Sequence, residues 1–302
     1  MPLEISFGEF LKDGRHIFTG IVRDITERKQ AEEKLHHYTT ELERSNRELQ
    51  DFAYISSHDL QEPLRKVIAF GDRLKMKYSE ILGEDGLDYL ERMQNATGRM
   101  QSLINDLLTY SRVTTKAKPF KPTNLKDVVS QIVVDLENRI SQTGGRVEIG
   151  ELPTINADKT QMFQLFQNLI ANALKFHKAG ETPLVTVKSR LIPPNPPLEK
   201  GGGRGDFVKG GNLLSPPLKK GDEGGFHEIT VEDNGIGFDE KYLDRIFKPF
   251  ERLHGRKEFE GTGMGLPICR KIINRHGGEI TAKSSQDKGS TFIVTLPERQ
   301  KE

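Results

Sequence analysis

Hydrophobic positions in the first third of the chain change from a strand-like to a helix-like spacing. Apolar and polar residues alternate on both sides of Asp13-Gly14, which predicts two short strands around a turn. After Thr26 the spacing becomes helical and apolar residues recur every seven positions, as in a dimeric coiled coil. A single amphipathic helix packed on its own domain is the alternative. The seam comprises Leu35, Leu42 and Leu49, with Tyr38, Ser45 and Phe52 three positions after each, and Ser45 weakens it.

The helical spacing continues to about Leu82, stops at Gly83–Gly86 and resumes from Leu87 to Leu108. This pattern predicts a helical hairpin over residues 51–113, preceded by a coiled-coil helix over 29–50. Each helix has a single apolar stripe, so one hairpin cannot close a core by itself. We therefore expect a homodimer in which two hairpins form a four-helix bundle.

A new pattern of alternating helices and strands follows residues 114–123, whose prolines and lysines predict a linker with a hinge. Helices that cover one face of a mixed sheet would give an α+β fold over 124–298. The expected helices span 125–142, 158–177, 240–247 and 264–276, and the expected strands span 146–150, 184–191, 227–233, 278–283 and 290–296.

Residues 192–226 interrupt this pattern with prolines, glycines and lysines, and Pro196–Gly201 nearly repeats as Pro216–Gly221. Such a composition buries too little apolar surface to offset the entropy of ordering, so we expect a disordered insert between two antiparallel strands. A proline-rich ligand for a partner is the alternative. Loop length costs only about 0.6 kcal/mol per doubling, so the surrounding fold should survive.

Composition and charge argue against several classes of function. Hydrophobic residues make up 34% and charged residues 29%, and the net charge of +1 gives no sign of a nucleic-acid or membrane surface. No apolar run approaches the roughly 18 residues of a membrane helix. The single cysteine, Cys269, cannot form a disulfide within the chain, and the N-terminus lacks the order of a signal peptide. We expect a protein of the reducing cytoplasm.

Two glycine-rich segments carry the most chemical information. Asp233–Phe238 (DNGIGF) follows an expected strand, so an acid stands at the end of the sheet beside glycines that allow a ligand to approach closely. Gly261–Leu266 (GTGMGL) opens an expected helix, where backbone N–H groups and the helix N-terminus can bind phosphate. The polar residues 251–260 between them are long enough to act as a lid.

The helix expected over 158–177 adds three polar groups on one face. Asn168, Asn172 and Lys175 are spaced i, i+4 and i+7, opposite a set of apolar residues. Asparagine oxygens suit Mg²⁺, which prefers a few protein oxygens plus phosphates, and lysine can neutralise a phosphate. A merely solvated helix face is the alternative.

Together these segments resemble the GHKL ATPase superfamily, and specifically the histidine kinases, whose ATP-binding domain is the Bergerat α/β sandwich. The resemblance implies ATP and Mg²⁺ as ligands, with Asp233 bonded to the adenine amino group and Asn172 to the metal. Asn168 and Lys175 would lie near the phosphates. The other implied ATP-binding residues are Gly235, Gly237, Phe247, Phe250, Gly261, Thr262, Gly263, Gly265, Leu266 and Thr291.

Residues 52–64 resemble the H box of the same kinases, with His58 as the phosphoacceptor and Asp59 as its acid–base partner. Pro63 removes the helical hydrogen bond to the carbonyl of Asp59, so the helix should bend beside His58. Superfamily members that hydrolyse ATP have a glutamate base one turn before the magnesium asparagine. This chain has Asn168 there, and asparagine cannot accept a proton from water.

The resemblance also implies partners. The phosphoryl group would pass to an aspartate in the receiver domain of a response regulator, and Glu62, where Thr or Asn is common, predicts a kinase with little phosphatase activity. Residues 1–28 resemble only the end of a PAS domain, so the stimulus would come through a longer protein or an upstream sensory partner. A non-catalytic nucleotide-binding scaffold and a chaperone-type or repair-type GHKL ATPase are the competing readings.

Overall fold

A computed structural model describes the backbone of residues 1–12, 15–115, 117–193, 225–253, 255, 259 and 261–298. Within this part, the side chains at 10, 12, 15, 17, 43, 46, 47, 49–56 and 58 lie outside the description. The chain divides into two compact units, Met1–His58 and Asp59–Glu302. The boundary between the units falls inside one long helix, α1 (Thr26–Thr115).

The first unit contains a β-hairpin and the beginning of α1. Strands β1 (Leu3–Lys12) and β2 (Arg15–Asp24) pair antiparallel, which confirms the two expected strands, and each is ten residues long. Asp24 begins the helix, because its carboxylate accepts hydrogen bonds from the backbone N–H (2.9 Å) and the hydroxyl (2.6 Å) of Thr26. The turn at Asp13-Gly14 lies outside the described residues.

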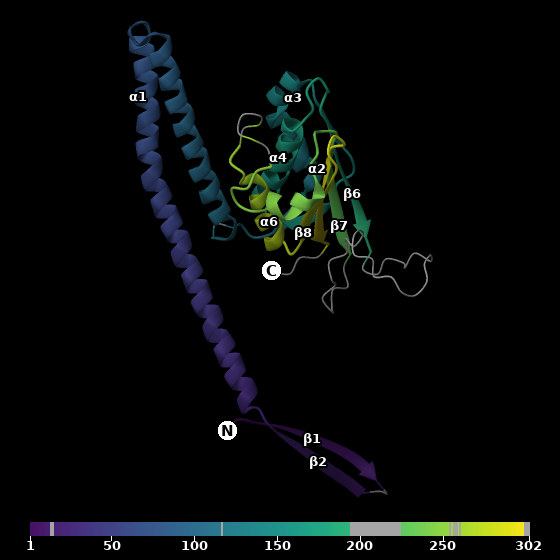
Figure 1. Cartoon of the computed structure of the whole chain (residues 1–302). Helices are drawn as coiled ribbons and strands as arrows, with labels where there is room; N and C mark the ends of the chain where they lie inside the picture. The colour runs from purple at the N-terminus through teal and green to yellow at the C-terminus, as the bar shows by residue number, and fades with distance from the viewer. Residues whose placement is uncertain are drawn as a thin grey trace. The chain divides into compact units, whose positions relative to one another are not determined.

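In the second unit, α1 turns back on itself and forms the expected helical hairpin (Figure 1). Its torsions leave the helical region at Tyr78 (φ −130°, ψ 18°) and at Gly83 (φ 61°, ψ −177°). Gly83 lies at the predicted break, where glycine adopts a positive φ without a steric penalty. The torsions stay helical at Pro63, so the helix is not broken there, and the bend expected beside His58 stays a prediction.

Two hydrogen bonds between side chains join the arms of the hairpin. Gln61 Nε2 donates to Asn105 Oδ1 and Gln94 Nε2 donates to Asp72 Oδ1, both at 2.7 Å. Large apolar side chains nevertheless remain exposed on both arms, as expected for a hairpin whose apolar stripe needs a second copy to cover it. These side chains are Leu60, Val67, Phe70, Leu74, Met76, Ile81, Tyr89, Met93 and Met100.

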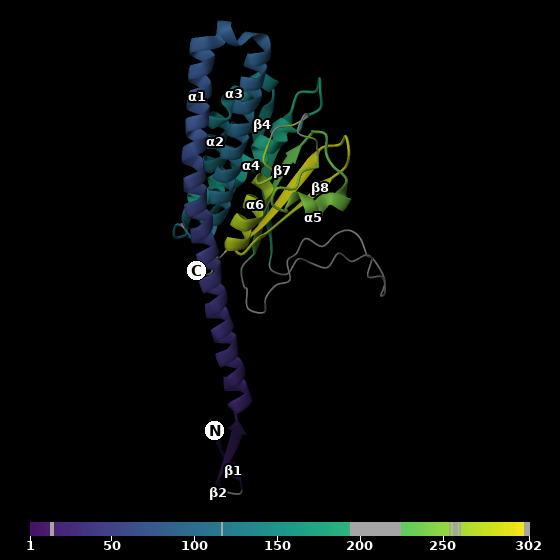
Figure 2. The same cartoon turned by 60° about the vertical axis from the view of Figure 1, so that its left-hand side comes forward.

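The rest of the unit is built on a mixed sheet of five strands, as predicted, and the structure gives their order as β4-β6-β7-β9-β8 (Figure 2). Only the β4–β6 pair is parallel. The inward-facing positions of the strands are apolar, and alternation along each strand gives the sheet one buried face. The strands are β4 (Arg146–Ile149), β6 (Leu184–Ile192), β7 (Phe226–Asp233), β8 (Glu279–Ser284) and β9 (Ser290–Pro297).

Helices α2, α4 and α6 cover that face and bury Phe166, Leu169, Ile170 and Ile272 completely (Figure 2). The single helix expected over 125–142 is instead two helices that meet at Leu136, which lies between the helical and extended regions (φ −96°, ψ 5°). The helices are α2 (Leu125–Asp135), α3 (Glu137–Thr143), α4 (Lys159–Lys175), the 3₁₀ turn η1 (Glu240–Tyr242), α5 (Leu243–Ile246) and α6 (Gly265–Arg275).

Part of the expected linker is a strand. β3 (Lys121–Asn124) pairs antiparallel with β5 (Thr154–Ala157), and neither strand was predicted. Both are four residues long and one of them contains a proline, so their periodicity is too short to distinguish them from a loop. This pairing fixes the chain to the α/β part of the second unit from Lys121 onwards, in the region where the sequence suggested a hinge.

The predicted insert enters between two paired strands, as expected. β6 and β7 are antiparallel, and their register continues to the Ile192–Phe226 pair next to the insert. The fold of the sheet therefore survives the insertion. Residues 194–224, which make up most of the insert, lie outside the described residues.

Candidate nucleotide-binding site

A cavity of about 150 Å³ opens among α4, the ends of β7 and β9, and the two glycine-rich segments. A cavity of this size accepts a single aromatic ring system, so it fits a purine base while the phosphates of a nucleotide would lie outside it. Eight residues predicted from the sequence line the cavity: Asn172, Lys175, Asp233, Gly237, Gly261, Gly263, Gly265 and Leu266.

Asp233 is the polar anchor of the cavity. Its Oδ1 accepts hydrogen bonds from the backbone N–H groups of Gly235 (2.9 Å) and Ser290 (3.1 Å), so the carboxylate is held by two loops. Burial raises the pKa of Asp233 to about 6, and nearby Glu232 raises it slightly, while the two backbone hydrogen bonds oppose the rise. The carboxylate is therefore ionised at neutral pH but weakly solvated, which makes it a strong acceptor for an amino group.

Glycine is required at two turns beside Asp233. Gly237 has a φ of 59°, and an added Cβ would lie 2.1 Å from the carbonyl oxygen of Ser285. Gly289 has a φ of 85°, and its Cβ would lie 1.9 Å from the carbonyl oxygen of Asp233. Both turns need a left-handed backbone and a close approach between chain segments, which only glycine allows at no cost.

The three polar residues on α4 have different surroundings. Asn172 and Lys175 reach the cavity, and the Lys175 ammonium group lies 4.1 Å from the centre of the Phe176 ring. Asn168 does not line it, because its Nδ2 donates to the carbonyl oxygen of Gly265 at 3.4 Å and so braces the start of α6. Asn172 is thus the α4 asparagine that could give an oxygen to a phosphate-bound metal ion.

The segment that precedes α6 is held by side chains on both sides. Arg252 Nη1 donates to the carbonyl oxygen of Gly261 at 2.9 Å, and Nη2 donates to that of Phe259. The Phe259 ring packs against Phe176 with 4.9 Å between centroids. On the other side, the hydroxyl of Thr262 donates to Asp106 Oδ2 on α1. The lid predicted over 251–260 is described only in part.

Five other predicted ATP-binding residues do not line the cavity. Phe247 is buried in the core beneath the Arg270 guanidinium, and Phe250 is 51% exposed with a positive φ of 64°. Thr291 lies on β9 between Ser290 and Phe292, and strand alternation turns those two neighbours into the cavity instead. The other two are Gly235 and Thr262.

Ten lining residues were not among the predicted site residues. Most are apolar and form the walls that a flat base would contact, and the only sequence signal for many of them is that they lie beside a predicted site residue. Arg252 and Glu251 lie in the segment that was expected to be a lid. The full set is Ala173, Phe176, Ile236, Phe238, Ile246, Glu251, Arg252, Leu253, Ser290 and Phe292.

The H-box segment lies on the first arm of α1. His58 is the last residue of the first unit, and its side chain lies outside the description. Asp59 is exposed. Glu62 forms an ion pair with Lys66 one turn later, with 2.7 Å between Oε1 and Nζ, and both side chains are more than half exposed. The roles assigned to His58 and Asp59 stay predictions.

No group of three or more histidine, cysteine, aspartate or glutamate side chains able to hold a metal occurs among the described residues. Within the same part of the chain, no helix has both the length and the apolar character needed to cross a bilayer.

Two family descriptions match the chain. Residues 157–300 match the histidine kinase-, DNA gyrase B-, and HSP90-like ATPase family, and residues 48–116 match the His Kinase A (phospho-acceptor) domain. The phytochrome-like protein Cph1 of Synechocystis sp. is 40% identical over 269 residues, which are 89% of this chain and 32% of Cph1. The chain spans about a third of the length of the curated relatives that it matches.

Two solved structures share the fold at 21% identity each. Full-length ShkA in complex with AMPPNP has a TM-score of 0.56 and aligns over 83% of this chain and 46% of ShkA. Histidine kinase ThkA in complex with the response regulator protein TrrA has a TM-score of 0.51 and aligns over 98% of this chain and 75% of ThkA. The chain therefore belongs to the histidine kinases, with a phospho-acceptor domain followed by an ATPase domain.

Proposed function

We propose that this chain is the catalytic core of a sensor histidine kinase that binds Mg-ATP, phosphorylates itself on His58 and passes the phosphoryl group to an aspartate of a response regulator. The observation that carries the proposal is Asp233, a partly buried acceptor fixed by two backbone N–H groups at the wall of a cavity of purine size. Such an acceptor pairs with the amino group of adenine, whereas it would repel the carbonyl oxygen of guanine.

The phosphates of the bound ATP would lie between α4 and the start of α6. Gly261, Gly263 and Gly265 allow the backbone to approach them, and the N-terminus of α6 adds a partial positive charge. Lys175 would neutralise phosphate charge, and magnesium held with Asn172 would supply further neutralisation. Phosphoryl transfer depends mainly on such positioning and charge stabilisation.

Asn168 would make the hydrolysis of bound ATP slow at this site. An amide side chain cannot act as a general base towards water, and here its Nδ2 is engaged with the backbone of Gly265. The bound ATP would therefore be hydrolysed slowly and remain available to another nucleophile. This favours a kinase over an ATPase of the chaperone or repair type.

The neutral imidazole of His58 would attack the γ-phosphorus, so that an N–P bond forms while the bond from the γ-phosphorus to the bridging oxygen of ADP breaks. Asp59 would orient or receive the proton on the other ring nitrogen. The phosphoryl group would then move to a carboxylate of the partner, in line with the matched structure of ThkA with a response regulator.

A homodimer would complete the helical part. Apolar side chains of the proposed seam, Leu35 and Leu42, are 69% and 70% exposed in the single chain, and both hairpin arms expose further apolar residues. Burying this surface against a second copy gains about 25 cal/mol per Å². An upstream sensory region, as part of a longer chain or as a partner, would act through the same helix.

The test is incubation of the chain with γ-labelled ATP and Mg²⁺, followed by treatment of the labelled protein with acid and with base. We expect an acid-labile, base-stable label that is lost in His58→Gln and kept in His36→Gln, a matched histidine on the same helix. Label that persists in His58→Gln would refute the assignment. Nucleotide binding without any label would favour the non-catalytic scaffold.

Glu62 makes the proposed enzyme a kinase with weak phosphatase activity. Its carboxylate would repel the aspartyl phosphate of the partner and the water that attacks it. Glu62→Thr should therefore speed removal of phosphate from the phosphorylated response regulator, with autophosphorylation little changed. If the unaltered chain already removes that phosphate as fast as it transfers it, this role of Glu62 is wrong.

A further inference from the structure

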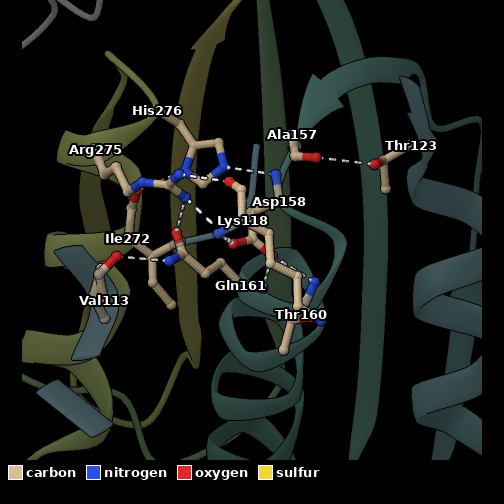
Figure 3. A network of polar contacts seen from close by, with 10 residues as sticks. All are labelled: Val113, Lys118, Thr123, Ala157, Asp158, Thr160, Gln161, Ile272, Arg275 and His276. Carbon is tan, nitrogen blue, oxygen red and sulfur yellow. Dashed lines mark hydrogen bonds and ion pairs between the residues drawn. The ribbon is translucent and has the colours of Figure 1, made fainter. Parts of the chain in front are cut away.

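A polar cluster, with buried Asp158 and Gln161 at its centre, joins the end of α1 to α4 and α6 (Figure 3). We call it the junction cluster, and it consists of Val113, Lys118, Asp158, Gln161 and Arg275. Val113, Asp158 and Gln161 are 3%, 2% and 6% exposed. None of the five residues lines the nucleotide cavity, so the proposed reaction assigns them no part.

Gln161 uses both ends of its amide in the cluster. Its Nε2 donates to the carbonyl oxygen of Val113 at 2.7 Å, and its Oε1 accepts from Arg275 Nη1 at 2.8 Å. Val113 lies in the last turn of α1, where carbonyl groups have no helical partner. The side chain of Val113 is also part of the hydrophobic core of the ATPase domain. Gln161 therefore fixes the end of α1 to that domain.

Arg275 and Asp158 hold the next part of the chain by its backbone. The N–H of Lys118 donates to Asp158 Oδ2 at 2.9 Å, and the carbonyl oxygen of Lys118 accepts from Arg275 Nη2 at 2.7 Å. Asp158 also caps α4 through the N–H groups of Thr160 and Gln161. The Arg275 guanidinium lies 4.6 Å from the centre of the Phe120 ring. Both backbone groups of Lys118 are thus set by α4 and α6.

The position of the cluster in the fold relates it to the phosphates. Asp158 and Gln161 stand at the first turn of α4, whose last turn carries Lys175, and Arg275 ends α6, which begins at Gly265. At 1.5 Å per residue these helices are about 16 to 25 Å long. The two helices that would hold the phosphates at one end are therefore tied to the linker at the other.

Stability alone is a weak reason for such a cluster. Arg275 Nη1 lies 3.4 Å from Asp158 Oδ2, and replacing such a largely buried ion pair with apolar residues of similar volume is often neutral or stabilising, because desolvation offsets the attraction. The hydrogen bonds of Gln161 and Arg275 also go to backbone atoms, so they determine the path of the chain. Phosphoryl transfer loses rate steeply when the reacting groups are misplaced by about 1 Å.

We propose that Gln161 and Arg275 are positioning residues for phosphoryl transfer, which hold residues 113–120 and the ATPase domain together as one body. The inference rests on the proposed function. The ATPase domain is then carried by the last turn of α1 and not by a flexible linker. The phosphates then have a defined place relative to the end of α1.

The test compares Gln161→Met, which keeps side-chain length and loses both hydrogen bonds, with Gln131→Met on the exposed face of α2. In the full chain, kcat for autophosphorylation should fall at least about tenfold in Gln161→Met, while the Kd for AMPPNP stays within about twofold. Arg275→Gln should behave in the same way, with the exposed Arg146→Gln as its control. Hydrogen–deuterium exchange at the backbone N–H of Lys118, which donates to Asp158, should be faster in Gln161→Met than in the unaltered chain, as measured by mass spectrometry of the peptide that contains it.

Three results would overturn the positioning role. An unchanged or increased kcat in Gln161→Met would exclude it, and so would hydrogen–deuterium exchange at Lys118 that is no faster. A Kd that weakens by the same factor as kcat would indicate a general structural role. If the unaltered chain gives no acid-labile label, the proposed function itself fails. If instead Gln161→Met is labelled as fast as the unaltered chain, only the positioning role fails.

Discussion

Asp233→Asn should make the empty ATPase domain more stable while weakening its affinity for ATP. The carboxylate has a pKa of about 6 against an ordinary value of 3.8, so the folded chain binds the proton more tightly than the unfolded chain between these two pH values. Stability therefore falls as pH rises through this window and stays reduced above it. A rise of this size corresponds to a loss of about 3 kcal/mol in the free energy of unfolding at pH 7.5.

Asparagine is a matched replacement because Oδ1 can keep both backbone hydrogen bonds, from Gly235 and Ser290. The lost oxygen becomes an NH₂ group, which removes the charge and sets a donor against the adenine amino group. We expect the free energy of unfolding to rise by roughly 1 to 3 kcal/mol at pH 7.5 and less at pH 5. The affinity for AMPPNP should fall by about 1 to 3 kcal/mol, or roughly 5-fold to 150-fold.

Urea unfolding without nucleotide, at several pH values from 5 to 7.5, measures the change in the free energy of unfolding. Calorimetric titration with AMPPNP and Mg²⁺ measures the change in affinity. The difference in stability between Asp233→Asn and the unaltered chain must grow with pH. A difference that is constant with pH would show that Asp233 is not the titrating group. A variant that binds AMPPNP as tightly as the original would refute its role as the adenine acceptor.

Three further predictions concern Gly237 at the cavity and two buried side chains of the ATPase domain, Cys269 and His276. Gly237→Ala should lower the Tm and abolish AMPPNP binding, because the added Cβ would meet the carbonyl oxygen of Ser285. The control Gly98→Ala has open space around the added Cβ and should change neither the Tm nor the binding. Burial raises the pKa of the Cys269 thiol to about 12, so a thiol reagent at pH 8 should modify it only after unfolding in urea, and fast reaction of the native chain would contradict this. Burial lowers the pKa of His276 below 6.5. The neutral imidazole therefore contributes fully to the free energy of unfolding above pH 6.5, and this contribution is lost as pH falls below that value. The free energy of unfolding of His276→Gln should depend less on pH in this range.

The order of helices and strands could be predicted because local periodicity determines it. The hairpin break at Gly83, the mixed sheet and the helix that carries Asn172 all follow from spacings of apolar residues within one element. The pair β3 and β5 could not be found in this way. Each strand is too short to show a period, and each exists because the other pairs with it.

The site was predicted only where a motif lies on a single segment. Asp233 lines the cavity, and so do all the predicted glycines of the two loops except Gly235, since their placement depends on neighbours in the sequence. Strand register decides which face of β9 lines the cavity. Packing between distant segments decides that Phe247 is buried and Phe250 is not. Ser290 and Phe292 therefore replace Thr291 at the cavity wall.

The sequence by itself determined the two matched domains and the chemical groups that each brings. The tertiary structure alone decided how the linker is held, because Gln161 reaches Val113 from 48 residues away along the chain and Arg275 reaches Lys118 from 157 residues away. No local pattern marks a glutamine that will bond to a distant carbonyl group. Such contacts exist only after the core has brought α1, α4 and α6 together.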